Sequence, residues 1–237
     1  MEKKTVRGTG VVGGYAYAPA AWTRPAYVPP ASGTHVAEDA RAAEVDRFKA
    51  AAETVAARFT DRASSATGVA TEVLGATAAL ARDRGWIRAA TKLINGGEQA
   101  EQATAKAIDQ FVVQFEKVGG LMAERTTDLK DIRDRVVAEL MGLPEPGVPK
   151  PTSPIVLCAQ DLAPADTAGL DPTMIKALVT RFGGPTSHTA IIARQLGIPC
   201  IVAASDLESV VEGAPILVDG TSGIITLSPD PAQAQEL

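Results

Sequence analysis

The sequence predicts an α/β domain that is built from both ends of the chain, with an all-α helical bundle inserted into it. Short β-prone segments occur near the N-terminus and in the last third of the chain, whereas the region between them is alanine-rich and has helical periodicity. Proline-rich segments at 25–30 and 144–151 separate these regions. We therefore expect an α/β domain of residues 1–30 and 146–237, and a bundle of residues 31–145.

The N-terminal segment, residues 4–22, combines glycine with valine, tyrosine and tryptophan, and it predicts one or two strands with tight turns. Its run GTGVVGG, at 8–14, loosely resembles a glycine-rich phosphate loop. It lacks the helix that follows such a loop and the Lys-Ser or Lys-Thr pair that ends one. We therefore interpret this run as a turn.

The middle of the chain predicts four or five helices, because apolar residues recur there at steps of three and four. Short glycine-containing loops between the helices are typical of an antiparallel bundle. Gly142 and Pro144 supply a stop after the last helix. The predicted helices contain residues 45–59, 70–83, 86–94, 108–118 and 121–140.

The C-terminal region predicts buried strands, because its short apolar runs are bounded by Gly, Pro or Asp. A helix at 188–196 separates the second strand from the third, closed by Gly197 with Pro199 beyond it. The predicted strands lie within 154–159, 175–180, 199–204, 215–220 and 223–228.

Composition and charge disfavour several classes of protein. The chain has 237 residues, 46% of them hydrophobic and 22% charged, which is an ordinary globular balance. A net charge of −5 without a basic stripe argues against nucleic-acid binding. We expect no signal peptide and no membrane span, because no apolar run approaches about 18 residues. Cys158 and Cys200 lie in apolar segments and are expected to be buried free thiols, as in a cytoplasmic protein.

His188 is the candidate functional residue, because it stands between a Gly-Gly pair and an apolar helix. Thr186 or Ser187 can cap that helix, which places His188 in its first turn. A helix N-terminus stabilises phosphate and keeps an imidazole neutral, and hence nucleophilic. A histidine that accepts a phosphoryl group needs these conditions. Gly184, Thr186 and Ser187 are the candidate phosphate-binding residues.

Other interpretations of His188 are less consistent with the pattern. A core or capping histidine does not require two glycines and two hydroxyls beside it. A metal site is disfavoured because the other histidine, His35, lies in a Pro/Gly/Ser segment and the cysteines lack ligand spacing. A serine hydrolase would need a G-x-S-x-G turn, which the sequence does not contain.

The segment GGPTSHTAIIARQLGIPCIV, at 183–202, resembles the phosphohistidine signature of the phosphoenolpyruvate-utilising enzymes. In the dikinases and synthases of this family a large ATP-binding module precedes the histidine domain. Here a helical bundle precedes it, and the segments at 124–143 and 162–171 are similar to enzyme I of the bacterial sugar phosphotransferase system. The chain therefore resembles the N-terminal half of enzyme I. The alternative is the histidine domain of a dikinase-like or synthase-like enzyme, or a non-catalytic docking module that kept the fold.

This resemblance implies a swivelling phosphohistidine domain. His188 would take a phosphoryl group on Nε2 from phosphoenolpyruvate and pass it to a histidine of the phosphocarrier protein HPr. Thr167 matches the family position whose hydroxyl orients the imidazole. The family has a C-terminal barrel that binds phosphoenolpyruvate and Mg²⁺. We expect this barrel to be absent here, where 230–237 resembles the start of a linker helix, and we expect no metal in this chain.

The resemblance also implies that the bundle is the docking surface for HPr. One departure from the family concerns the second helix, where the small residues at 76, 78 and 79 replace bulky ones, and Arg82 and Arg84 flank an acid. HPr affinity and charge pattern are therefore expected to differ. The expected contact residues are Ala79, Leu80, Asp83, Leu121, Met122 and Arg125.

Overall fold

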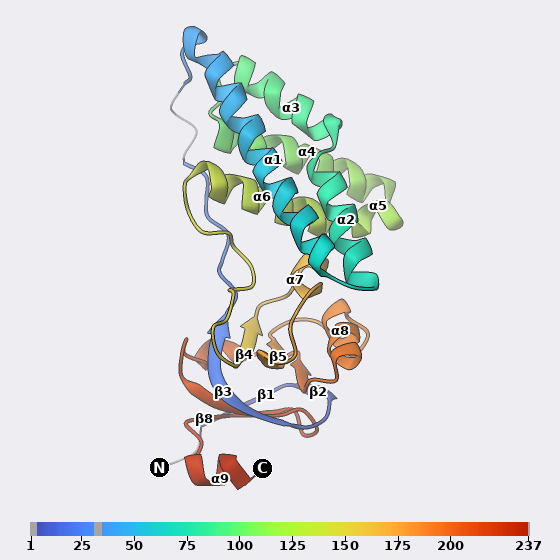
Figure 1. Cartoon of the computed structure of the whole chain (residues 1–237), viewed down its shortest axis with the longest axis vertical. Helices are drawn as coiled ribbons and strands as arrows, with labels where there is room; N and C mark the ends of the chain where they lie inside the picture. The colour runs from blue at the N-terminus through green and yellow to red at the C-terminus, as the bar shows by residue number, and fades with distance from the viewer. Residues whose placement is uncertain (1–3, 31–34, 237) are drawn as a thin grey trace. The chain divides into compact units, whose positions relative to one another are not determined.

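A computed structural model of the chain describes residues 4–30 and 35–236. The chain divides into two compact units, one formed by residues up to 24 together with 147–237, and the other by 25–146. The first unit contains the sheet and the second is helical (Figure 1). The predicted fold class, an α/β domain from both chain ends with a helical insert, is confirmed.

An eight-stranded mixed sheet forms the α/β unit, in the order β1-β8-β7-β3-β4-β5-β6-β2. The four consecutive strands from β3 to β6 are parallel, and the remaining pairs are antiparallel. The strands are β1 (Thr5–Arg7), β2 (Thr9–Val12), β3 (Tyr15–Trp22), β4 (Ile155–Ala159), β5 (Ile175–Thr180), β6 (Cys200–Val202), β7 (Pro215–Asp219) and β8 (Ile224–Leu227).

The N-terminal segment forms three strands, where one or two were predicted. β1 and β2 are separated by Gly8 alone, yet they lie at opposite edges of the sheet, so the sheet curves back on itself. The N–H of Gly8 donates to the carbonyl of Gly223 at 2.8 Å. A Cβ on Gly10 would stand 2.2 Å from the carbonyl oxygen of Gly220, so this approach requires glycine. The run at 8–14 therefore closes the sheet and does not form a phosphate loop.

The strands of the sheet differ in how far their residues are buried. β4, β5 and β6 are buried almost throughout, as predicted, because a core cluster lies on each face. β7 and β8 alternate between buried and more exposed residues, which differs from the buried strands expected. One face of an antiparallel strand can remain in water, whereas parallel strands are covered on both faces.

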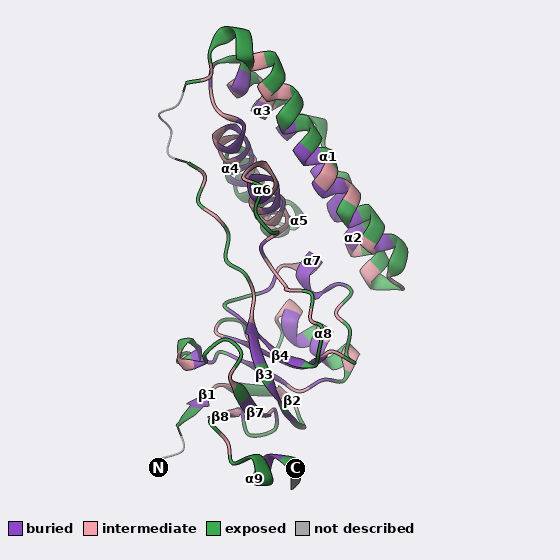
Figure 2. Cartoon of the chain, turned by 60° about the vertical axis from the view of Figure 1, so that its left-hand side comes forward, coloured by how far each residue is buried: buried purple, intermediate pink, exposed green. Residues whose placement is uncertain are grey.

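The described part of the second unit contains six helices, where four or five were predicted, because the last predicted helix is divided in two. Figure 2 shows α1 buried along one side and exposed along the other. Phe48 and Trp86 are fully buried and meet edge to face, with ring centroids 5.5 Å apart. The helices are α1 (Arg41–Ser65), α2 (Val69–Ala81), α3 (Arg84–Asn95), α4 (Ala100–Val118), α5 (Leu121–Glu124) and α6 (Thr126–Leu140), with a 3₁₀ turn, η1 (Glu38–Ala40), before α1.

The last predicted helix, 121–140, is broken in two at Arg125. The hydroxyl of Thr126 donates to the carbonyl of Ala123 at 2.8 Å, beside the junction. Leu121 is 78% exposed, because α5 follows two glycines with positive φ and leaves the apolar stripe that α6 continues. The apolar spacing therefore continues through 121–140 in the sequence, but α5 and α6 do not form one continuous buried face.

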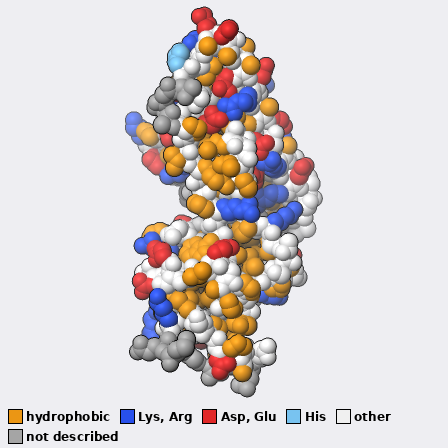
Figure 3. Space-filling view, turned by 90° about the vertical axis from the view of Figure 1, so that its left-hand side faces the viewer, with side chains coloured by type: hydrophobic (Ala, Val, Ile, Leu, Met, Phe, Trp, Pro, Cys, Tyr) orange, Lys and Arg blue, Asp and Glu red, His pale blue; other side chains and the backbone are white. Residues whose placement is uncertain are grey.

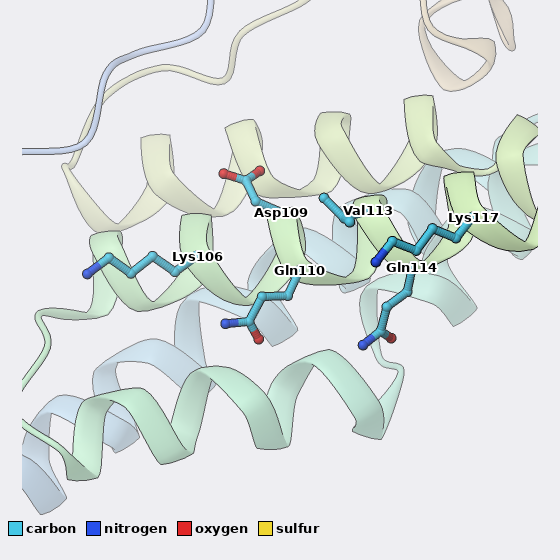
Figure 4. Close-up of a pocket in the computed structure, with 6 residues that line it drawn as sticks. All are labelled: Lys106, Asp109, Gln110, Val113, Gln114 and Lys117. Carbon is cyan, nitrogen blue, oxygen red and sulfur yellow. The ribbon is translucent and has the colours of Figure 1, made fainter.

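The surfaces of both units are chemically mixed. Figure 3 shows hydrophobic side chains among acidic and basic ones on the face it presents. An open hollow of about 570 Å³ lies along α4, and Figure 4 shows that all six lining residues come from this one helix. Two of them are already engaged, Lys106 with Glu98 and Asp109 with Arg133. None of the described helices is long and apolar enough to cross a membrane.

Candidate functional site

The helix that carries His188 begins and ends where the sequence predicted. α8 (His188–Leu196) has Ser187 as its N-cap, and the Ser187 Oγ accepts the N–H of Ala190 at 3.3 Å. Gly197 ends the helix in the left-handed conformation, with φ of 67°. Thr186 and Ser187 were both candidates for the cap, and the structure selects Ser187.

The loop between β5 and α8 is fixed at its start by hydrogen bonds to the end of β4. The N–H of Arg181 donates to the carbonyl of Ala159 at 3.1 Å, and the N–H of Phe182 donates to that of Gln160 at 3.0 Å. The buried hydroxyl of Thr180 donates to the carbonyl of Phe182 at 2.7 Å. The loop therefore leaves the sheet in one defined direction.

The two glycines of the loop have different roles. Gly183 has φ of 95°, and a Cβ placed on it would stand 3.3 Å from the Oγ of Ser187. The chain therefore doubles back at this point, and only glycine adopts the conformation without strain. At Gly184 a Cβ would meet nothing within 4 Å, and its carbonyl accepts the N–H of Ser187 at 3.0 Å.

His188 is half-buried, and its Nε2 is a buried atom with no hydrogen-bond partner among the residues that the structure describes. Burial lowers the pKa of the imidazole. The ring is therefore neutral at pH 7. An Nε2 without a partner retains its lone pair for an incoming electrophile if Nδ1 carries the proton.

Gly184, Thr186 and Ser187, the predicted phosphate-binding residues, lie within four residues of His188 at the start of α8. The first N–H groups of a helix have no acceptor within it. Ser187 Oγ accepts the N–H of Ala190. The N–H groups of His188 and Thr189 have no acceptor within the helix, so they can face an anion. Thr186 is exposed. These groups could together bind phosphate oxygens, and that role stays a prediction.

Thr167 ends the short helix α7 (Pro164–Thr167), which packs against α8 and lies next to it in Figure 1. Its side chain is buried, and its hydroxyl donates to the carbonyl of Pro164 at 2.8 Å. No hydrogen bond joins Thr167 to His188 within the described part of the chain. The predicted orienting role of Thr167 therefore stays a prediction.

Sequence reasoning did not select Thr180, Phe182 or Glu208. Arg181 pairs with Glu208 of the 3₁₀ turn η2 (Leu207–Ser209), and its guanidinium lies 5.1 Å from the ring centroid of Phe182. Phe182 itself was a visible signal in the sequence, because it is an aromatic residue directly before the Gly-Gly pair. The ion pair between Arg181 and Glu208 could not be seen in the sequence, because it joins residues that are distant along the chain.

Metal ligation finds no support in the described ranges, 4–30 and 35–236. No three His, Cys, Asp or Glu side chains are grouped there as a metal site would require. His35 lies over Gly97, and its Nε2 is 3.0 Å from Nη2 of Arg41. Cys158 and Cys200 are buried free thiols, as predicted.

The predicted docking residues of the bundle occupy two places, the end of α2 and the turn around α5. Ala79 and Asp83 are exposed and Leu80 is half-buried at the first place. Asp83 caps α3 by accepting the N–H of Gly85 at 3.2 Å, and Leu80 accepts the indole N–H of Trp86 at 3.1 Å. These two residues therefore also have structural roles.

Leu121, Met122 and Arg125 are exposed at the second place, around α5. Both α2 and α5 pack against α6, so the bundle holds the two places on a common support. Arg82, which the sequence marked as unusual, pairs with Glu53 at 2.9 Å. Part of the charge of this region is therefore neutralised within the bundle.

Comparison with known proteins shows the family to which this chain belongs. The family model of the mobile domain of PEP-utilising enzymes matches residues 151–223, and that of their N-terminal domain matches residues 7–125. Since the second match covers half of the chain, the chain belongs to the PEP-utilising enzyme family.

Individual relatives within this family share one name. A phosphoenolpyruvate-protein phosphotransferase of Streptomyces coelicolor is 42% identical over 225 residues, which are 95% of this chain and 40% of that protein. One of Haloferax volcanii is 37% identical over 201 residues, 81% of this chain and 33% of that protein. The chain thus spans less than half the length of these curated relatives.

Solved structures agree with this assignment. A solution structure of Enzyme I has a TM-score of 0.82 at 28% identity, and the match covers 98% of this chain and 96% of that one. The N-terminal domain of Enzyme 1 - Nitrogen has a TM-score of 0.66 at 24% identity, covering 98% and 97%, and it shows the shared fold alone. The resemblance to the N-terminal half of enzyme I is confirmed.

Proposed function

We propose that this chain carries a phosphoryl group on Nε2 of His188 and exchanges it with a histidine of the phosphocarrier protein HPr. The observation that carries the proposal is the buried Nε2 without a hydrogen-bond partner among the described residues, in the first turn of a capped helix. In the complete protein, phosphoenolpyruvate would be the first donor and sugar uptake the purpose. The activity is that of a phosphoenolpyruvate-protein phosphotransferase, as the two relatives are named.

The transfer step needs no net proton movement. Nε2 is buried in this structure, so the ring of His188 has to turn to expose it. The lone pair on Nε2 of the neutral ring then attacks phosphorus in line, and a new N–P bond forms. The N–P bond to the partner's histidine breaks, and its electron pair stays on that ring nitrogen. Each ring keeps the proton on its other nitrogen throughout, so the reverse step follows the same path.

The surroundings of His188 favour each part of this step. A lowered pKa keeps the attacking ring neutral. The N–H groups of His188 and Thr189 and the positive end of α8 would stabilise the phosphate oxygens. Gly184 brings main chain without a side chain to the same place. Thr167 is proposed to hold the ring in the reactive tautomer.

Other parts of the proposal concern the complete protein. The bundle residues at the end of α2 and around α5 are proposed as the HPr contact. A C-terminal barrel is proposed to bind phosphoenolpyruvate and Mg²⁺, since no grouping of ligands for a metal occurs in the described residues of this chain. The two buried thiols are consistent with a cytoplasmic location.

A dikinase-like histidine domain is the competing function. The match of residues 7–125 to the family's N-terminal model, and the names of the two relatives, favour enzyme I. Incubation of the purified chain with phosphorylated HPr decides between them. We expect a mass increase of one phosphoryl group, and its absence would contradict the proposed function.

A further inference from the structure

Two large apolar side chains are exposed beside the candidate site. Phe182, in the loop that leads to α8, is 53% exposed, and Ile191, on α8 itself, is 44% exposed. Ile191 follows His188 by three residues, so both lie on neighbouring positions of one helix face. We call Phe182 and Ile191 the apolar rim.

Phe182 is held in its exposed position. Its main-chain N–H and carbonyl are both hydrogen-bonded, to Gln160 and Thr180 respectively. The guanidinium of Arg181 lies 5.1 Å from the ring centroid and is itself paired with Glu208. Phe182 therefore has a defined position although it is 53% exposed, and a fixed aromatic ring beside a candidate site is suited to anchor a contact with another molecule.

The loop brings Phe182 close to the start of α8. A Cβ on Gly183 would stand only 3.3 Å from Ser187 Oγ, so the chain folds back directly after Phe182. The main chain next to Phe182 is therefore near the start of α8, and Ile191 lies one helical turn after His188, so both residues of the apolar rim belong to the surroundings of the candidate site.

We propose that the apolar rim contacts the surface of HPr around its reactive histidine and excludes water while the phosphoryl group passes. This inference rests on the proposed function and adds to it a docking contact on the α/β unit itself. Aromatic side chains are favoured as anchors at such interfaces. Excluding water strengthens the electrostatic stabilisation of the phosphoryl group and prevents hydrolysis of the N–P bond.

The charge of the rim indicates which partner it fits. Arg181 is neutralised by Glu208, so the rim presents an apolar, uncharged surface. A site that holds phosphoenolpyruvate must instead present cations to a phosphate and a carboxylate. An apolar rim therefore fits the surface of a protein donor such as HPr, which can form a dry contact, better than it fits phosphoenolpyruvate.

The test compares two phosphate donors. Phosphoramidate, a small chemical donor, phosphorylates imidazoles without a docking surface, whereas phosphorylated HPr needs one. For Phe182→Ala we expect the second-order rate constant with phosphorylated HPr to fall roughly tenfold more than that with phosphoramidate. The effect should appear mainly in KM. Ile191→Ala should give a smaller loss of the same kind, and Phe182→Leu should retain most of the rate.

Tyr15→Ala is the matched control, because Tyr15 is an aromatic residue of the same unit with 51% exposure. It should transfer phosphate as the unaltered chain does. Equal losses with both donors, or no loss in Phe182→Ala and Ile191→Ala, would overturn the role of the rim alone. Failure of the unaltered chain to accept phosphate from phosphorylated HPr would overturn the proposed function, and the rim with it.

Discussion

The hydroxyl of Thr167 donates its hydrogen to the carbonyl of Pro164, at 2.8 Å. This bond uses the one hydrogen that a threonine hydroxyl has and leaves its oxygen lone pairs as acceptors. If Thr167 contacts His188 during the reaction, it can therefore only accept a hydrogen bond from Nδ1–H. That tautomer leaves Nε2 unprotonated, which matches the buried Nε2 that has no partner among the described residues.

Thr167→Val should slow phosphoryl transfer by roughly tenfold to a hundredfold, because it removes the acceptor that positions the ring while keeping the shape of the side chain. The measurement is a single-turnover rate with phosphorylated HPr. Thr173→Val, at an exposed threonine of the same unit, is the control and should have no effect. A Thr167→Val rate equal to that of the unaltered chain would show that the proposed role is wrong.

His188→Ala should preserve the fold and abolish phosphoryl acceptance, because the side chain is half-buried and supplies the nucleophile. His35→Ala should still accept one phosphoryl group, although it loses the contacts with Gly97 and Arg41 in the bundle. Intact-mass measurement after incubation with phosphorylated HPr distinguishes the two variants. Phosphate on a serine or on His35 would contradict the assignment of His188.

Local signals in the sequence were sufficient to predict the helix that carries His188. Ser187 caps α8 and Gly197 ends it as predicted, because capping depends on residues within a few positions of each other. The parallel strands from β4 to β6 were also predicted, since each is a continuous apolar run between turn residues.

Contacts between distant residues could not be predicted in this way. The split of the N-terminal segment at Gly8 depends on pairing with β8 at one edge and β6 at the other. The break at Arg125 depends on where α5 packs rather than on its apolar spacing. The position of Phe182 depends on Arg181 and on Glu208, which follows it by 26 residues in the sequence.

Gly183→Ala and Gly184→Ala should differ although the residues are adjacent. Alanine at 183 must adopt φ of 95°, so we expect a loss of about 1–2 kcal/mol in the free energy of unfolding of the α/β unit. Alanine at 184 meets no neighbour and should change it by less than about 0.5 kcal/mol. Urea unfolding followed by Trp22 fluorescence, with Trp86→Phe as the common background, measures both.

The same pair tests the phosphate contact. If phosphate approaches the main chain at Gly184, the methyl group of Gly184→Ala should slow transfer from phosphorylated HPr roughly tenfold without loss of stability. A transfer rate for Gly184→Ala equal to that of the unaltered chain would exclude Gly184 from the phosphate site. Equal stabilities of the two variants would contradict the loop conformation.

The titration of His188 should be displaced to acid pH. Burial lowers the pKa of the ring in the folded chain, so its midpoint should lie below the ordinary histidine value of about 6.5. The unfolded chain then binds the proton first as the pH falls, so the stability contributed by neutral His188 is lost as pH falls through and below that value. NMR titration of the His188 ring checks the midpoint, and one at or above 6.5 would contradict the burial argument.

The choice of phosphate donor follows from the charges around His188. Transfer from phosphoenolpyruvate needs cations on the transferring group and on the carboxylate, normally Mg²⁺ and Arg or Lys side chains. The arginines nearest to His188 in the sequence are Arg181 and Arg194. Arg181 is already paired with Glu208, and Arg194 lies in the last turn of α8, six residues away. Three clustered metal ligands are not found in any part of the chain that the structure describes.

Transfer between two protein histidines requires less, namely in-line approach, a helix N-terminus and a dry contact. This 237-residue chain should therefore accept phosphate reversibly from phosphorylated HPr in the presence of a metal chelator. It should stay unphosphorylated when mixed with phosphoenolpyruvate and Mg²⁺ alone. The measurement is acid-labile, base-stable phosphate on the purified chain after incubation with each donor. Efficient labelling by phosphoenolpyruvate without a further protein would show that this chain holds a complete donor site, and it would contradict the proposed division of labour between this chain and a barrel domain.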